Sequence, residues 1–306
     1  MQSSRLTLPV MAALGAVYFF WGTTYLGMKF AIETLPPFFM LSFRFTAAGA
    51  LMLAWACSRQ NPQLTWRQVR GSAAAGGLML LGGTGLVAWA EQFVPSNIAA
   101  IVIATMPLWM ALLRWVALKG DRPGKTSMAG LVLGFLGTLL LVRSTTTGAE
   151  TVEGHTLGLA VLVLAALLWA TGSLVSRGME QPRVPALATS IQLLSGGFCC
   201  LVAGLATGEA ARVHLEAISL RSAAALAYLV VFGSVVAFSC YTWLLKKTDP
   251  ALASSYAYVS PVVAVTAGWL LAGERLNAGS LLATGVILTA VVLIVRGTAG
   301  PGKAET

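Results

Sequence analysis

Two ionisable residues stand in long apolar runs and are the side chains best placed to do chemistry. Arg44 lies several residues inside the run 37–57, and Glu91 closes the run 69–90. A guanidinium inside a membrane span costs at least about 2.5 kcal/mol on insertion scales, so it needs a partner or an aqueous cavity. Its planar fork suits a carboxylate. We predict that Arg44 binds an anionic group or gates its release; the alternative is a structural Arg that bonds helix-end carbonyls or snorkels outward.

Glu91 has mainly apolar or small neighbours. A partly buried carboxylate has a raised pKa, so Glu91 is predicted to exchange protons in a coupled cycle or to hold a substrate ammonium. The alternative is a helix-end charge wetted at the membrane surface. Both interpretations stay open from the sequence.

Aromatic side chains are numerous and fall into two kinds. Those near the ends of apolar runs, such as Tyr241 and Trp243, are typical of interfacial belts. Trp21, Trp169 and Tyr256 lie deeper, as does Tyr258, and are predicted to wall a cavity that accepts an amphipathic substrate, with helix packing as the alternative. With Arg44, the residues predicted to bind substrate are Trp21, Tyr25, Trp169, Tyr256, Tyr258 and Ser260.

Pro107 and Pro261 occupy matching positions inside two apolar runs. Proline removes an N–H and clashes with the preceding turn, so both are predicted to bend their helices and to act as hinges or gates. Gly130 and Gly134 form a small-residue face suited to close helix contact or to dimerisation, which leaves monomer and homodimer open.

The remaining reactive residues do not form an enzyme's constellation. His155 and His214 lie in connections without metal-ligand spacing nearby, and the four cysteines form no Cys-x-x-Cys pair. We therefore expect no cofactor, no metal and no catalytic residue. A membrane-embedded lipid-modifying enzyme and a passive facilitator or channel are the alternatives.

The elements that must position these residues are membrane helices. The chain is 57% hydrophobic and 10% charged, with a mean hydropathy of +0.79, whereas soluble proteins are nearer one quarter charged. The +9 net charge resides in short connections, where topology selects Lys and Arg, so nucleic acid is not an expected partner. The expected spans are 9–32, 37–57, 69–90, 94–118, 126–142, 156–176, 185–207, 220–245, 250–272 and 279–295.

Charge and repetition order these ten spans. With the amino terminus in the cytoplasm, 14 of the 20 Lys and Arg residues fall inside, five outside and Arg44 in the membrane, which predicts that both termini are cytoplasmic. Trp21 and Trp169, Pro37 and Pro185, and Gly49 and Gly197 are each 148 residues apart. Two repeats follow, 9–142 and 156–296. Because each has five spans, the second is inverted, the architecture of alternating access.

Several motifs resemble a known family. They are Trp21-Gly22-Thr23-Thr24-Tyr25, Arg44-Phe45-Thr46-Ala47-Ala48-Gly49, Pro95-Ser96-Asn97-Ile98-Ala99-Ala100 and Pro250 to Pro261. In this order and spacing the chain resembles the EamA family of the drug/metabolite transporter superfamily, in particular its bacterial inner-membrane members. The resemblance covers essentially the whole chain.

The resemblance implies an all-α, polytopic fold of ten transmembrane helices in two inverted five-helix repeats. It implies a central cavity lined by spans one to four and six to nine, and a secondary transporter that exports small metabolites such as amino acids or amphipathic drugs. Protons are the candidate coupling ion and the lipid bilayer is the environment. The second repeat departs from the first, with Gln192 at the position of Arg44, so a binding role is assigned to first-repeat residues.

Overall fold

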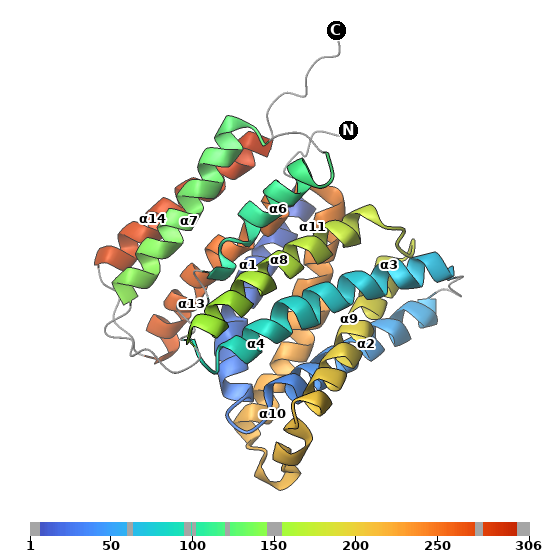
Figure 1. The fold of residues 1–306 in the computed structure, drawn as a ribbon. Helices are drawn as coiled ribbons and strands as arrows, with labels where there is room; N and C mark the ends of the chain where they lie inside the picture. Colours follow the sequence, from blue (N-terminus) through green and yellow to red (C-terminus); the bar gives the residue numbers. More distant parts are fainter. Residues whose placement is uncertain are drawn as a thin grey trace.

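The protein is described from a computed structural model that defines residues 7–59, 64–94, 99, 102–119, 123–145, 155–272 and 278–298. Every regular element in these residues is a helix (Figure 1). The elements before residue 146 are α1 (Leu8–Ala31), α2 (Pro37–Arg59), α3 (Trp66–Gly76), η1 (Gly77–Gly85), α4 (Leu86–Ala90), α6 (Met106–Val116) and α7 (Lys125–Thr145).

The later part of the chain repeats this succession. Its elements are α8 (His155–Gly178), α9 (Pro185–Ala206), two short 3₁₀ turns η2 (Glu209–Arg212) and η3 (Leu215–Ala217), α10 (Leu220–Tyr228), η4 (Leu229–Ala237), α11 (Phe238–Lys247), α12 (Pro250–Ser254), α13 (Tyr256–Ala272) and α14 (Ala278–Thr298).

Local sequence sets where several helices begin. Prolines start α2, α9 and α12, where the missing N–H costs nothing because the first turn has no acceptor for it. Thr65 caps α3: its hydroxyl oxygen accepts from the Gln68 backbone N–H at 3.3 Å, while the Gln68 side chain accepts from the Thr65 N–H at 3.2 Å. This capping box satisfies two donors that the helix itself leaves unpaired.

Within the described residues, six helical stretches are long and apolar enough to cross a membrane: Leu8–Met28, Pro37–Arg59, Trp66–Ala90, Thr156–Gly178, Pro185–Ala206 and Leu220–Lys247. Three more apolar helices are shorter. The expected span 94–118 lies partly outside the described residues, and the expected span 250–272 is divided by a turn at Ser255 into α12 and α13. Membrane helices are confirmed, while the count of ten stays a prediction.

Two long helices widen into π-helical turns at their centres. The segments are η1, between α3 and α4, and η4, between α10 and α11, and each has nine residues. A π-helical turn interrupts the regular hydrogen-bond ladder and often marks a functional site. Both segments border the cavity described below.

Helix pairing is the same in the two parts of the chain. α1 packs against α13, α10, η4 and α11, while α8 packs against α6, α3, η1 and α4. α2 lies along α9, and α7 lies along α14 (Figure 1). A Cβ on Gly49 would come 2.8 Å from the Leu194 side chain, and a Cβ on Gly197 would come 2.5 Å from the Thr46 hydroxyl. Gly197 follows Gly49 by 148 residues and Leu194 follows Thr46 by the same number, so the 148-residue spacing relates one contact to the other.

The small-residue face of α7 is used inside the molecule. A Cβ on Gly130 would lie 2.9 Å from the Ala290 carbonyl oxygen of α14, and one on Gly134 would lie 2.8 Å from the ring of Tyr258. Helix packing within the chain therefore occupies the face for which dimerisation was an alternative.

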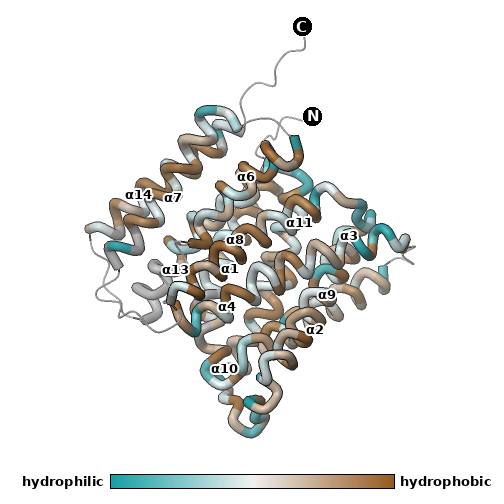
Figure 2. Tube along the Cα trace, in the orientation of Figure 1, coloured by the Kyte–Doolittle hydropathy of each residue, from teal (hydrophilic) through white to brown (hydrophobic). Residues whose placement is uncertain are grey.

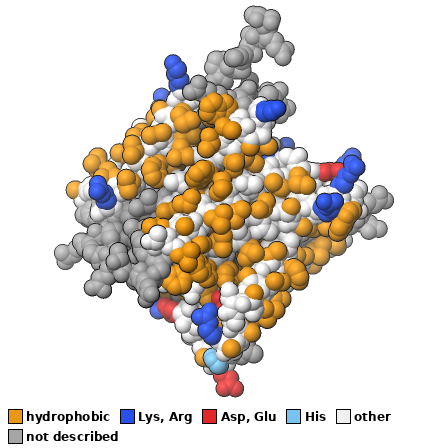
Figure 3. Space-filling model, viewed as in Figure 1, with side chains coloured by type: hydrophobic (Ala, Val, Ile, Leu, Met, Phe, Trp, Pro, Cys, Tyr) orange, Lys and Arg blue, Asp and Glu red, His pale blue; other side chains and the backbone are white. Residues whose placement is uncertain are grey.

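The outer surface is mainly apolar. Large hydrophobic side chains such as Phe43, Trp55 and Phe198 are more than half exposed. Apolar side chains cover the middle of the molecule, and hydrophilic residues gather at helix ends and connections (Figures 2 and 3). An apolar surface of this extent is suited to contact with lipid.

Candidate functional site

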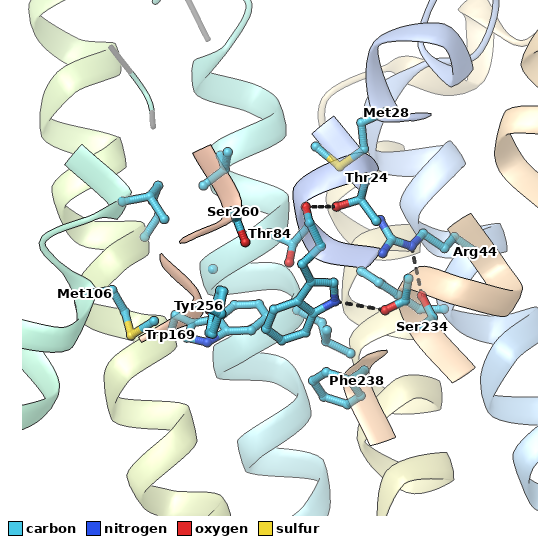
Figure 4. Close-up of a pocket in the computed structure, with 18 of the residues that line it drawn as sticks. Thr24, Met28, Arg44, Thr84, Met106, Trp169, Ser234, Phe238, Tyr256 and Ser260 are labelled. Atoms are coloured by element: carbon cyan, nitrogen blue, oxygen red, sulfur yellow. Dashed lines mark hydrogen bonds between the residues drawn. The ribbon is translucent and has the colours of Figure 1, made fainter. Parts of the chain in front are cut away.

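A cavity of about 110 Å³ lies between helices from both parts of the chain. From the first part, α1, α2, η1, α4 and α6 contribute side chains; from the second, α8, α9, η4, α11 and α13 do. In Figure 4, Arg44, Ser234 and Thr24 occupy one side of the cavity, and Ser260, Tyr256, Trp169 and Met106 the other. The cavity is therefore charged and polar on one side and largely aromatic on the other.

Arg44 is the only charged side chain among the described lining residues. It is 5% exposed, and its Nε donates to Ser234 Oγ at 2.8 Å. No carboxylate pairs with it, and its terminal nitrogens have no hydrogen-bond partner, among the residues that the structure describes. A buried, unpaired charge is costly, so this guanidinium is poised for a ligand of opposite sign.

Gly233 gives the guanidinium room. A Cβ at Gly233 would lie 2.6 Å from Arg44 Nη2, closer than side chains tolerate. The carbonyl oxygen of Gly233 also accepts a hydrogen bond from Trp21 Nε1 at 3.0 Å. Gly233 and Ser234 of η4 thus position both Arg44 and Trp21.

Four aromatic rings form a contiguous cluster at one end of the cavity. Trp21 is the centre: its ring centroid is 4.4 Å from that of Tyr256, 5.0 Å from Tyr241 and 5.6 Å from Trp169. Tilted and edge-to-face contacts of this kind add to the stability gained by burial. The predicted aromatic wall is present for Trp21, Trp169 and Tyr256.

Tyr241 was expected in an interfacial belt, and that expectation is wrong. Its side chain is fully buried, its hydroxyl hydrogen-bonds with Ser173 Oγ at 2.6 Å, and Trp169 Nε1 donates to the Tyr241 hydroxyl at 3.2 Å. The physical reason is that α11 packs against α1 and α8 and so turns this ring into the protein.

Hydroxyl groups complete the polar part of the lining. Thr24 Oγ1 donates to the Trp21 carbonyl at 2.7 Å. Ser260 is 2% exposed, and its Oγ has no hydrogen-bond partner among the described residues. An unpaired buried hydroxyl costs free energy, so a hydrogen bond between Ser260 and a polar atom of a ligand would lower that cost.

Other predicted residues fall outside the lining. Tyr258 is fully buried, but its hydroxyl donates to the Leu131 carbonyl at 3.0 Å and its ring packs on α7, so it does not face the cavity. The side chain of Tyr25 lies outside the described residues. Pro107 was expected inside a helix, but it lies in the first turn of α6, just after the turn that ends at Thr105. Pro261 is inside α13, directly after Ser260.

Glu91 immediately follows α4 and does not line the cavity, although Val87, one turn before it, does. Its side chain is partly buried and has no hydrogen bond or ion pair among the described residues. Burial raises the pKa of this carboxyl from its ordinary value to about 7. Glu91 can therefore change protonation state near neutral pH.

A second, more open depression of about 490 Å³ lies on the other side of the aromatic cluster. It is lined by residues including Ala13, Met52, Trp55 and Ser239. Along α1 the order is Ala13 in this depression, Trp21 in the cluster, and Met28 in the cavity. At 1.5 Å per residue, Trp21 lies about 12 Å from Ala13 and about 10 Å from Met28 along the helix axis.

The sequence did not single out Ser234, Gly233 or Met106, which also line the cavity. Ser234 stands in an apolar run, where a lone serine gives little signal. No cluster of three or more metal-ligating side chains occurs in the searched, described residues.

Comparison with known proteins agrees with this architecture. The EamA-like transporter family matches residues 8–143 and again residues 156–296. The chain belongs to the EamA-like transporter family. Among its EamA relatives is YedA of Escherichia coli, named an uncharacterized inner membrane transporter, which is 38% identical over 295 residues, covering 96% of this chain and 92% of that protein.

Two further comparisons extend over most of the chain. Protein PagO of Salmonella typhimurium is 28% identical over 282 residues, covering 89% of both chains. A solved crystal structure aligns with a TM-score of 0.74 at 18% identity, covering 94% of this chain and 96% of that one. The latter supports the fold alone.

Proposed function

We propose that this EamA-family protein is a secondary transporter that exports small metabolites, such as amino acids or amphipathic drugs, by alternating access. The observation that carries the proposal is Arg44: a buried guanidinium without a counter-ion among the described residues, facing a cavity between the two parts of the chain. Such a charge in a membrane protein is expensive and marks substrate or ion pathways.

The proposed mechanism uses two inverted repeats, 9–142 and 156–296, in the bacterial inner membrane with both termini cytoplasmic. Support comes from the reciprocal contacts of Gly49 and Gly197 and from the equivalent neighbours of α1 and α8. In inverted-repeat transporters one bundle rocks against the other about a site near the midplane. The aromatic cluster around Trp21 is the proposed barrier between the cavity and the second depression.

Polar contacts on the proposed cytoplasmic side would stabilise closure there. Arg114 of α6 forms an ion pair with Asp249, which caps α12. Arg177 of α8 donates to the carbonyls of Leu245 at 2.9 Å and Thr248 at 2.5 Å. These contacts join α6, α8 and α11 beyond the aromatic cluster. Opening toward the cytoplasm would have to break them.

In this mechanism Arg44 contacts the anionic group of the substrate, and Glu91 exchanges the coupling proton. The test is uptake of a broad panel of amino acids and other metabolites by everted vesicles or proteoliposomes under an imposed pH gradient. Arg44→Gln is expected to lower transport by more than about tenfold, as expected when one partner of a buried charged contact is removed.

The matched control is Arg221→Gln, which also removes one positive charge but from an exposed side chain paired with Glu33. It is expected to transport normally. The proposal fails if no solute of the panel moves, or if Arg44→Gln and Glu91→Gln both fold and transport like the unsubstituted protein. Current through a planar bilayer without a substrate gradient would favour a channel instead.

A further inference from the structure

The charge around the cavity has one sign. Arg44 is positive, and no acidic residue is among the described lining residues. The helices around the cavity also contain no Asp or Glu anywhere along their length. These helices are α1, α2, α6, α8, α9, α13 and the two continuous stretches 66–90 and 220–247. A cationic ligand group would meet Arg44 without a carboxylate to offset the repulsion.

Glu91 is the acid nearest in sequence to a lining residue of η1 or α4. It comes one helical turn after Val87 but is not part of the lining. The Glu91 carboxyl lies outside the cavity lining, so it does not offer a hydrogen-bond acceptor to an ammonium group bound beside Arg44. The described lining therefore offers no carboxylate to pair with the ammonium group of a zwitterion.

The guanidinium of Arg44 has hydrogen-bond donors that no described residue uses. Its Nε is used by Ser234, while the terminal nitrogens have no hydrogen-bond partner among the described residues. A carboxylate can accept two parallel hydrogen bonds from a guanidinium, and the contact is stronger in a site of low dielectric constant. An anion thus compensates the buried charge, which a neutral ligand leaves uncompensated.

The volume and the other lining residues of the cavity limit the size and the polarity of the ligand. The volume of about 110 Å³ has room for roughly ten water-sized groups at about 10–15 Å³ each. Trp169 and Tyr256 supply an aromatic surface, and Ser260 supplies one unpartnered hydroxyl on the side away from Arg44 (Figure 4).

We propose that the substrates of this cavity are small organic monoanions: a carboxylate on an aromatic or branched apolar body, without an ammonium group. This inference rests on the proposed transport function and narrows it, because it places amino acids and cationic drugs below carboxylates in affinity. The carboxylate binds Arg44, and the apolar body lies against the aromatic side.

The test compares four ligands with the same ring and different charge: benzoate, benzylamine, benzyl alcohol and phenylalanine. Binding to the purified full-length protein in lipid nanodiscs is measured by calorimetry at neutral pH. Benzoate is expected to bind more tightly than the other three. Arg44→Gln is expected to weaken benzoate on the order of a hundredfold and to leave benzyl alcohol nearly unchanged.

Two variants make the comparison specific. Arg221→Gln removes a positive charge outside the cavity and is expected to leave benzoate affinity unchanged. Arg44→Lys keeps the charge but loses the planar fork, so an intermediate affinity is expected. If Arg44→Gln does not fold, as judged by gel filtration, Arg44→Lys and the ranking of the four ligands decide the question.

Two results would overturn the inference. One is benzylamine or phenylalanine binding at least as tightly as benzoate; the other is the absence of Arg44-dependent binding for benzoate and for a set of short- and medium-chain monocarboxylates. The transport assay separates this failure from failure of the proposed function. Transport of amino acids with no preference for carboxylates would contradict only the substrate class, whereas Arg44-dependent benzoate binding without transport of any solute would contradict the function.

Discussion

Arg44 and Ser260 share a property that most buried polar side chains lack. Both are at least nine-tenths buried, and both keep hydrogen-bonding capacity that no described residue uses. Folding alone does not favour such groups, since each one loses contact with water without a full replacement. Both residues line one cavity, where a ligand could use this capacity.

Ser260→Ala is expected to leave the stability of the protein unchanged or to raise it, because the substitution removes an unpaired buried hydroxyl. The matched control in the same region is Ser254→Ala, which removes a hydroxyl that donates to the Ala251 carbonyl at 3.1 Å and is expected to cost about 0.5–1.5 kcal/mol. Thermal unfolding of both purified variants checks this. A larger loss for Ser260→Ala than for Ser254→Ala would show that its hydroxyl is satisfied.

Glu91 leads to a pH prediction. An unfolded carboxyl titrates near about 4.3, whereas burial raises the pKa of Glu91 in the folded protein to about 7. Between these values the folded state binds more protons, so the stability contributed by this group is present at low pH and is lost as pH rises through 7. Glu91→Gln is expected to flatten that part of the pH profile. The measurement is the melting temperature of the unsubstituted protein and of Glu91→Gln from about pH 4 to about pH 8, which covers roughly the range between these two pKa values. Parallel curves would contradict a raised pKa at Glu91.

Single residues were predictable from the sequence where their type conflicts with their surroundings. Arg44 conflicts with an apolar run, and Trp21 and Trp169 recur at one spacing, so these were found. Tyr241 and Ser234 were missed because a tyrosine or serine in an apolar run gives no sign of which way its helix will face. That direction depends on the packing of α11 and η4 against α1.

Among the elements, η1 and η4 border one cavity but differ in how the residue before each segment packs. The residue before η1 is Gly76, and the residue before η4 is Tyr228. Gly76 lets its helix approach α9 so closely that a Cβ would lie 2.1 Å from the Gln192 carbonyl oxygen. Tyr228 instead directs its hydroxyl to Thr23 Oγ1 at 2.5 Å.

The same contrast holds for the residues related to each other by the 148-residue spacing. Gln192 is closely packed, and its Nε2 donates to Ser176 Oγ at 3.0 Å and to Gln181 Oε1 at 3.3 Å. Arg44 faces a cavity. The sequence predicted that the two positions would differ, but the close approach at Gly76 depends on backbone geometry that residue patterns do not contain.

Gly76→Ala is expected to destabilise the protein by about 1–3 kcal/mol, because the added methyl group meets a backbone carbonyl that cannot move aside. Gly15→Ala is the control. It is also within a long helix, but a Cβ there meets nothing within 4 Å, so a gain of about 0.5–1 kcal/mol from the better helix former is expected. Unfolding of both variants in graded denaturant measures the difference, and equal stabilities would contradict the close contact.

For the whole molecule, the distribution of Lys and Arg sets an orientation that can be tested. In a Cys57→Ser background, Arg67→Cys near the start of α3 and His214→Cys between η2 and η3 introduce exposed thiols on sides that we expect to be opposite. A membrane-impermeant maleimide is expected to label Arg67→Cys only in everted vesicles and His214→Cys only in spheroplasts. Labelling of both from one side would rule out the proposed topology.

The fold was largely predictable at this scale. Hydropathy located the membrane helices. The spacing of tryptophan, proline and glycine predicted two related halves, which stays a prediction; one family model matches residues 8–143 and 156–296. At Pro107 a helix begins directly after a turn at Ala104 and Thr105, so the expected span is interrupted there, and the role of Pro107 as a hinge stays a prediction. Charge and hydropathy report burial along a chain, but they do not locate breaks caused by local backbone geometry.

The dipeptide Gly233-Ser234 connects Arg44 to the aromatic cluster through two hydrogen bonds. Its glycine carbonyl holds the Trp21 indole at 3.0 Å, and its serine hydroxyl holds the Arg44 guanidinium at 2.8 Å. Any movement of Arg44 relative to Ser234 would therefore act on the same short stretch of backbone that accepts the hydrogen bond of the tryptophan. By thermodynamic linkage such an effect is reciprocal. If anion binding weakens the hydrogen bond between Trp21 and Gly233, then breaking that hydrogen bond strengthens anion binding by the same free energy.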